Sequence, residues 1–211
     1  TGGAVSLLAD HDVTFLAAGD VTSANGNVVV TADADAAVGV DSGALTMTDG
    51  AVINAGSGLI DIDADADINV GGLVTTGEVQ ANAGAGGTGA IIDNGDTDAD
   101  ITAATAQLIA QTGIGDAGDV NGALDTVADA VATSLTIGAQ TESGDINVTN
   151  SGHLVVGTVN GTAGATIIDA TADDAGDDIA LVANSPLTVN DAVTNNDGGD
   201  ITLTAAGATT A

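Results

Sequence analysis

Apolar and polar residues alternate in short stretches along this chain, most clearly between Ile60 and Val70. Apolar side chains occupy every second position there. The residues between them are Asp61, Asp63, Asp65, Asp67 and Asn69. A strand places alternate side chains on opposite faces, whereas a helix would spread these aspartates around its circumference. The pattern therefore predicts strands with one apolar and one polar face.

The same layout recurs along the chain. A second apolar pair follows the first after eight to ten residues, and a third short apolar run and a glycine come next. Copies of this template begin at Val5, Val28, Ile60, Ile146 and Ile179. Strands of one kind recur after about twenty residues, a repeat length that is typical of solenoids. The chain is therefore expected to be all-β, with 1–211 forming a single parallel β-helix of roughly nine or ten coils.

Glycine and Asn-Gly pairs separate the expected strands. In the first 83 residues these strands are 4–9, 12–17, 27–32, 36–41, 44–48, 51–54, 59–64, 67–70, 73–75 and 78–82. A glycine-rich loop at 84–90 and an acidic turn at 93–100 flank a strand at Ile91-Ile92. Apolar residues recur at a helical spacing in 122–135, which leaves two alternatives open there, a short helix or a wide excursion of the chain.

Composition also favours a thin interior. Hydrophobic residues make up 44% of the chain, yet it has one Phe and no Trp or Tyr. Globular sandwiches normally bury large aromatic side chains at their centre. A solenoid interior is instead filled by small and branched residues that stack on similar residues in the next coil.

The net charge of −30, with no Lys or Arg, excludes nucleic acid as a partner because nothing could neutralise phosphate. It also excludes a polybasic attachment to anionic lipid. No apolar run reaches the ~18 residues that a membrane-spanning helix needs, so no membrane insertion is expected. The chain lacks cysteine and therefore any disulfide. Alternating Val and Ile runs argue against disorder despite the charge.

Both ends of the sequence fit the template. Residues 200–207 followed by a new copy of residues 1–9 would continue the same strand and corner rhythm. A solenoid with exposed ends needs polar caps, and none is visible in either end segment. The expected partners are therefore copies of the chain, or flanking repeats, stacked end to end.

Three motifs resemble a known group. Gly-Asp-Ile-Thr-Leu-Thr-Ala at 199–205, Gly-Asp-Ile-Asn-Val-Thr-Asn at 144–150 and Val-Thr-Thr-Gly at 74–77 are similar to the coils of filamentous-haemagglutinin-like proteins and related giant bacterial surface adhesins. The resemblance implies a right-handed parallel β-helix, secretion to the bacterial cell surface, and a stalk or adhesive role. The chain departs from that family in lacking every basic residue.

The aspartates have two interpretations. One is a solvated acidic face that keeps the protein soluble and limits sideways association. The other is calcium, which takes six to eight oxygen ligands and therefore needs a turn. The best candidate ligands are Asp93, Asp96, Asp98 and Asp100, followed by Asp173, Asp174, Asp177 and Asp178. Neither set matches the ligand spacing of an EF-hand loop.

Catalysis is not expected. Polysaccharide lyases with a parallel β-helix need a basic residue, and this chain has none. The two histidines, His11 and His153, are expected at corners, and no carboxylate pair is distinguished by its context. The sequence thus predicts a structural extracellular stalk or filament segment of a large bacterial adhesin. The alternative is a calcium-dependent adhesive or carbohydrate-binding module that engages cell-surface glycans.

Overall fold

The structure is a computed structural model that describes residues 2–34, 43–85, 87–93, 95–115, 121–169 and 176–207. Every regular element in these residues is a β-strand. In the described part of the chain there is accordingly no helix that could cross a membrane. The all-β class expected from the alternating pattern is confirmed.

The strands form three parallel sheets and one small hairpin. The first sheet runs in the order β1 (Val5–Ala9), β4 (Val28–Ala32), β7 (Ile60–Ala64), β10 (Glu78–Ala83), β13 (Thr105–Ala110), β15 (Leu135–Thr141), β17 (Leu154–Val156), β22 (Leu187–Val189), and is extended by β20 (Ala165–Ile167) and β23 (Val193–Asn195). The second contains β2 (Val13–Phe15), β5 (Leu45–Met47), β8 (Ile68–Val70) and β11 (Ile91–Asp93). The third contains β3 (Val21–Thr22), β6 (Val52–Gly56), β9 (Gly72–Thr75), β12 (Ile101–Ala103), β14 (Leu124–Ala128), β16 (Ile146–Asn150), β21 (Ile179–Ala183) and β24 (Ile201–Ala205).

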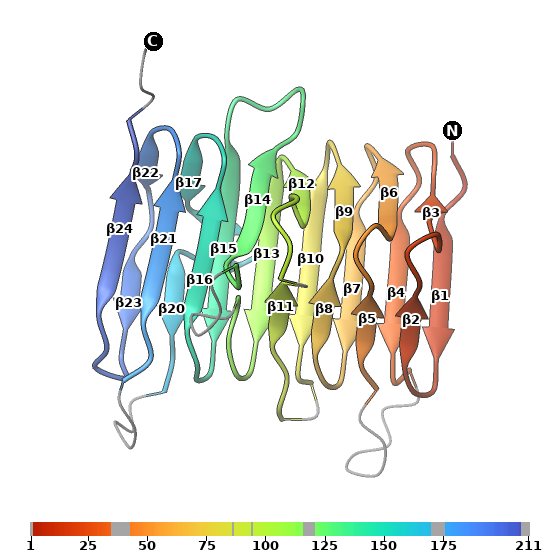
Figure 1. Cartoon of the computed structure of the whole chain (residues 1–211), viewed down its shortest axis with the longest axis horizontal. Coiled ribbons are helices and arrows are strands. Elements are labelled where there is room, and N and C mark those ends of the chain that lie inside the picture. The colour runs from red at the N-terminus through yellow and green to blue at the C-terminus, as the bar shows by residue number, and fades with distance from the viewer. Residues whose placement is uncertain are drawn as a thin grey trace.

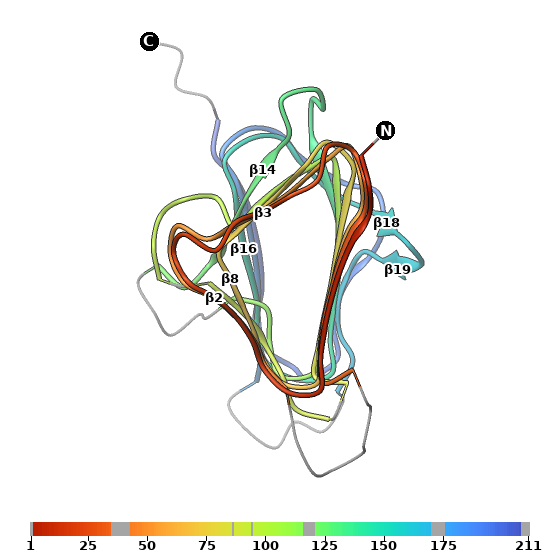
Figure 2. The same cartoon turned by 90° about the vertical axis from the view of Figure 1, so that its right-hand side faces the viewer.

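We call one passage of the chain through these sheets a rung. The first rung comprises β1, β2 and β3, and the last comprises β22, β23 and β24. Each strand pairs in parallel with the corresponding strand of the next rung, so the strands lie side by side from the N-terminal end to the C-terminal end (Figure 1). Viewed along the stack, the rungs follow a common closed path, except that the rungs near the N-terminus bulge outward beside β2 and β3 (Figure 2).

The strand register places the inward residues of each rung next to the inward residues of the neighbouring rungs. Ile60 pairs with Val28 on one side and with Val79 on the other, and all three side chains are buried. The full column of inward residues in the first sheet is Val5, Val28, Ile60, Val79, Ala106, Ile137, Val156 and Val189. Fully burying one such branched side chain contributes about 1.5–3 kcal/mol. The interior therefore consists of continuous apolar columns, filled mainly by small and branched residues, with Phe15 and Met47 among them.

Nine of the ten strands expected in the first 83 residues have a counterpart in the structure. The tenth, 36–41, lies outside the described residues. The first sheet has eight strands on its main path rather than the nine or ten coils expected. Loops such as 95–99 and 129–134, and a hairpin at 158–163, lengthen individual passages of the chain, so the same number of residues makes fewer of them.

The segment 122–135 is an excursion and contains no helix. Leu124 and Thr126 point inward from β14, which pairs with β12 and β16. The loop after it projects beyond the neighbouring rungs (Figure 1), and Val131 at its tip is 80% exposed. Asp129 stabilises this loop by accepting hydrogen bonds from the N–H groups of Val131 and Ala132. Pairing with two neighbouring strands thus outweighs the local helical spacing.

An antiparallel hairpin of β18 (Thr158–Val159) and β19 (Thr162–Ala163) interrupts the first sheet. It projects from the outer side of that sheet (Figure 2). Gln107 donates to the Thr162 hydroxyl at 2.8 Å and accepts from the Asn160 amide at 3.1 Å. A Cβ at Gly138 would lie 2.3 Å from the Thr162 carbonyl oxygen. Glycine at that position therefore allows the hairpin to lie against β15.

Candidate functional site

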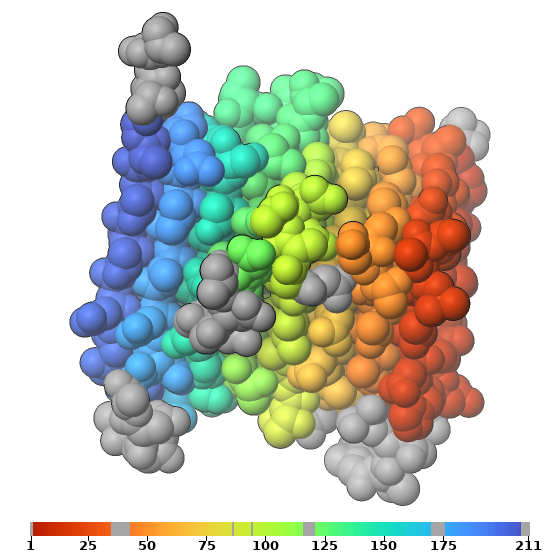
Figure 3. All heavy atoms as spheres, in the orientation of Figure 1, coloured from red at the N-terminus to blue at the C-terminus, as the bar shows by residue number. Residues whose placement is uncertain are grey.

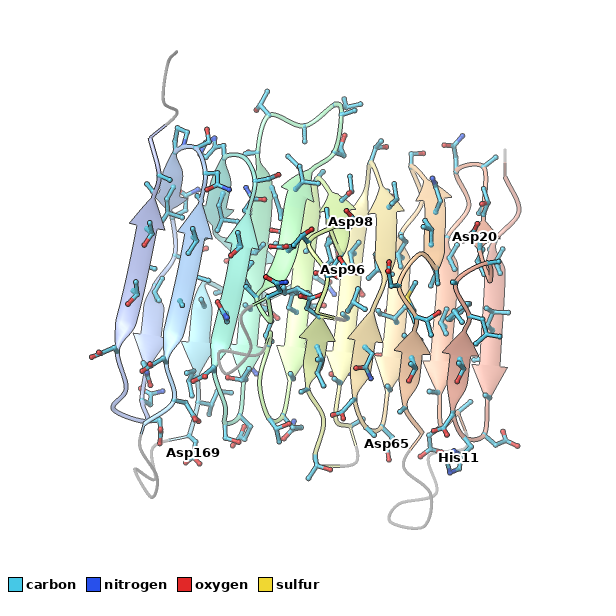
Figure 4. The ribbon with its side chains drawn as sticks, viewed as in Figure 1. His11, Asp20, Asp65, Asp96, Asp98 and Asp169 are labelled. Carbon is cyan, nitrogen blue, oxygen red and sulfur yellow. The ribbon has the colours of Figure 1, made fainter. Side chains whose placement is uncertain are left out.

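The four aspartates of the 93–100 turn do not point to one place. Asp93 ends β11 and pairs with Val70, so it occupies an inward position and is only 6% exposed. Asp100, just before β12, is 2% exposed. Asp98 is exposed, and its N–H donates to the Asp96 carboxylate at 2.7 Å. Asp96 and Asp98 lie on the loop that crosses the outer side of the stack (Figure 4).

Burial changes the electrostatics of this turn. Desolvation, followed by the charge of Asp93, raises the pKa of Asp100 from 3.8 to about 9. The N–H of Asp125 donates to Asp100 Oδ2 at 2.7 Å, which opposes the shift without cancelling it. Desolvation and then the charge of Asp96 also raise the pKa of Asp125. Asp100 is therefore protonated at neutral pH.

The described residues contain no group of three or more His, Cys, Asp or Glu side chains that could hold a metal ion. Calcium needs six to eight oxygens around one point, and the 93–100 turn divides its carboxylates between interior and exterior. Calcium binding at the 93–100 turn therefore stays a prediction, and the separation of its four carboxylates does not favour it.

The second predicted cluster is only partly described. Asp173 and Asp174 lie outside the described residues. Asp177 and Asp178 both bind main-chain amides of neighbouring rungs: the Asp177 carboxylate accepts the N–H of Gly144, and Asp178 accepts the N–H of Asp200 at 2.7 Å. These two carboxylates therefore join successive rungs.

The same role recurs at one corner of the stack, immediately before β2 and its counterparts. Asp12, Asp67, Asp145 and Asp178 each accept the N–H of the corresponding residue in the next rung. The recipients are Ala44 at 2.9 Å, Ala90 at 2.9 Å, Asp178 at 2.6 Å and Asp200 at 2.7 Å. We call this set the corner column. The N–H of Ala44 lowers the pKa of Asp12, as expected for a carboxylate that accepts a main-chain hydrogen bond.

The corner column explains aspartates that sequence reasoning had treated as a solvated face or as metal ligands. Carboxylates stacked at the usual strand spacing of about 4.8 Å repel by about 0.9 kcal/mol per pair in water. A hydrogen bond to a charged group contributes about 1.5–3 kcal/mol, which offsets that repulsion. The sequence signal was an aspartate directly before the first apolar residue of a strand, as in Asp67-Ile68 and Asp145-Ile146.

A line of main-chain hydrogen bonds runs beside the corner column. In each of the first seven rungs the inward residue that follows this corner donates its N–H to the carbonyl that precedes the equivalent residue of the next rung. The seven bonds are Val13 to Ala44 at 2.9 Å, Leu45 to Asp67 at 3.0 Å, Ile68 to Ala90 at 2.8 Å, Ile91 to Gly113 at 3.0 Å, Ile114 to Asp145 at 2.8 Å, Ile146 to Asp178 at 2.9 Å and Ile179 to Asp200 at 2.9 Å. The line crosses all eight rungs without interruption.

The outward aspartates of β7 lie next to amide side chains in the following rung. Asp61 pairs with Gln80 in the next rung, and Asp63 pairs with Asn82, whose amide donates to it at 3.4 Å. Desolvation, then the charges of Asp63 and Glu78, raises the pKa of Asp61. Acid is thus stacked on amide at these positions, which reduces the repulsion along the sheet.

A polar groove lies beside the 95–99 loop. It has a volume of about 320 Å³, and its polar side chains come from Thr97, Asp125, Thr149, Ser151 and Asn184. The groove offers a carboxylate, an amide and hydroxyl groups to a ligand. It contains neither histidine. His11 Nδ1 lies 3.0 Å from Asp12, and His153 Nε2 lies 2.9 Å from the Thr188 hydroxyl.

The two ends of the stack are open among the described residues. Strand β24 has no partner beyond it in the third sheet, and β2 has none before it in the second. All five residues of β24 are exposed, including Ile201 at 44% and Leu203 at 41%. The first and last rungs form the two end faces of the molecule (Figure 3).

Comparison with models of protein families, with curated proteins and with solved structures gives no match to this chain. The resemblance to adhesin coils thus depends on the residue motifs alone. The geometry gives those motifs a physical meaning. In Gly144-Asp145-Ile146 the glycine avoids a Cβ only 2.0 Å from the Thr112 carbonyl, the aspartate belongs to the corner column, and the isoleucine fills the interior.

Proposed function

We propose that the chain is a right-handed parallel β-helix that serves as a stalk or filament segment of a large bacterial adhesin at the cell surface. The observation that carries this proposal is the unbroken line of hydrogen bonds through all eight rungs. Many of the side-chain hydrogen bonds among the described residues also join one rung to the next, as in the corner column. Such an arrangement suits a rod whose task is to span a distance.

The mechanism of a stalk is mechanical. Each rung adds about 4.8 Å, so eight rungs give a rod of about 38 Å. Apolar columns exclude water from the interior, and the N–H and C=O groups of each strand bind the next rung. The negative charge of the many exposed aspartates opposes sideways clumping of such rods.

A distance measurement tests the stalk. The chain is placed between two rigid marker domains, and their separation is measured by electron microscopy and small-angle scattering. We expect a narrow distribution in which the chain contributes about 38 Å. A broad distribution, or markers held close together, would contradict the proposal.

The second candidate is an adhesive module that binds carbohydrate at the cell surface, with calcium as a bridging ion in the form predicted from the sequence. The polar groove beside the 95–99 loop favours it, because carboxylate, amide and hydroxyl groups suit the hydroxyls of a sugar. Its test is a glycan array in the presence of calcium and of a chelator. Saturable glycan binding that is lost in Asp125→Ala would support the adhesive module. If no glycan binds, the adhesive module is rejected and the stalk is the proposal that stands.

A further inference from the structure

We infer that a second copy of this chain docks on the last rung in one defined register, with its Asp12 over Asp200 and its Val13 over Ile201. This inference rests on the proposed function and specifies its partner. In this arrangement the exposed edge of β24 pairs with the edge of β2 in the second copy. Three features of the two edges agree on this alignment.

The first feature is the main-chain line. Ile179 donates to the carbonyl of Asp200, and Ala206 donates back to Ala183. In a parallel pair alternate residues bond to opposite sides, so the N–H of Ile201 points away from β21. Every earlier residue of this line donates to the residue that precedes its counterpart in the next rung. The eighth donor, Ile201, would therefore bind the carbonyl of Asp12 in the second copy.

The second feature is the corner column. Asp145 accepts from Asp178 at 2.6 Å, and Asp178 accepts from Asp200 at 2.7 Å. The carboxylate of Asp200 is the next acceptor in this series, and the N–H at the equivalent place in the first rung is that of Asp12. The two lines of hydrogen bonds thus agree on the same pairing.

The third feature is the interior. Ile201 is the last member of the column Val13, Leu45, Ile68, Ile91, Ile114, Ile146 and Ile179, which passes from the second sheet into β16, β21 and β24. Two residues further along, Leu203 would face Phe15. Leu203 is 41% exposed and Ile201 is 44% exposed, so docking removes apolar surface that the single chain leaves in water.

Charge sets the condition for docking. Each copy carries −30, and the corner column itself would bring Asp200 close to Asp12. The Debye length falls from about 10 Å at 0.1 M salt to about 3 Å at 1 M. Association should therefore strengthen as sodium chloride is raised, the opposite of what salt bridges would give.

The test measures sedimentation velocity and particle length in electron micrographs at 0.05 M and 1 M sodium chloride. We expect single rods at low salt and rods several copies long at high salt. Ile201→Pro removes the donor at an edge position where proline is tolerated, so it should keep the melting temperature and remain single. Ile201→Val is the matched control and should assemble like the original chain.

A second pair of variants tests whether Asp200 acts in docking as a hydrogen-bond acceptor or through its negative charge. Asn27 accepts the N–H of Leu59 at 3.1 Å in the same manner as the corner aspartates, so an asparagine can serve as acceptor. Asp200→Asn should assemble at least as well as the original chain. Asp200→Ala should lose a factor of about ten or more in association affinity. Equal behaviour of these two variants would overturn the register.

Single rods at every salt concentration, or assembly by Ile201→Pro, would overturn the inference. The distance between marker domains is independent of self-association, so it tells whether the stalk proposal fails as well. A chain that spans about 38 Å but stays single would retain the stalk and lose the docking.

Discussion

The buried carboxyl of Asp100 makes the stability of this protein depend on pH in a calculable way. Burial and the neighbouring Asp93 raise its pKa from 3.8 to about 9. The folded chain therefore holds a proton that the unfolded chain releases above pH 3.8. The stabilisation is complete below that value, and it is lost progressively as the pH rises towards 9.

One pKa unit corresponds to about 1.36 kcal/mol, so the loss between pH 5 and pH 8 is about 4 kcal/mol. That is a large part of the roughly 5–15 kcal/mol by which folded proteins are stable. Asp100→Asn keeps an oxygen for the N–H of Asp125 but has no proton to lose. Relative to the original chain, it should gain about 4 kcal/mol between pH 5 and pH 8.

The assay is urea unfolding of both chains at several pH values. Asp98→Asn is the matched control, because it removes one negative charge from an exposed position in the same loop. The control should show a difference from the original chain that hardly changes with pH. If Asp100→Asn behaves like the control, Asp100 is not protonated inside the fold and the electrostatic reasoning is wrong.

Three further predictions concern the interior, the corners and the metal. Ile62→Ala should lose about 2–5 kcal/mol in urea unfolding, whereas outward Asp61→Ala should lose far less; similar losses would contradict the inward assignment. Gly144→Ala should be less stable than Gly161→Ala, since both have positive φ but only the first Cβ meets a carbonyl, at 2.0 Å; equal stability would refute that contact. If the 93–100 turn binds calcium, calcium but not magnesium should raise the melting temperature, and an unchanged midpoint dismisses the ion.

Local pattern was sufficient to place most strands. Alternation in Ile60–Ala64 gave the inward and outward faces correctly, because the side-chain period of a strand is two whatever lies next to it. Glycine corners gave the strand ends for the same local reason. The pattern left two alternatives open at 122–135, because its apolar spacing suits a helix, and pairing with β12 and β16 decides for a strand followed by an excursion.

The roles of the aspartates were a different matter. Asp93 and Asp98 look alike in the sequence, yet one is inside the stack and the other is in water. Likewise Asp145 and Asp178 are thirty-three residues apart, and only the stacking of rungs brings the carboxylate of one to the N–H of the other. The hairpin at 158–163 follows the template in sequence but leaves the sheet in space.

The sequence by itself determined that short parallel strands would form, and which residues would face inward, because both follow from a period of two and from turn residues. Only the tertiary structure decided which carboxylates are buried, which join successive rungs, and how many rungs the chain makes. Burial and hydrogen bonding between rungs depend on residues roughly twenty to thirty positions apart, and the length of each loop sets which of them meet.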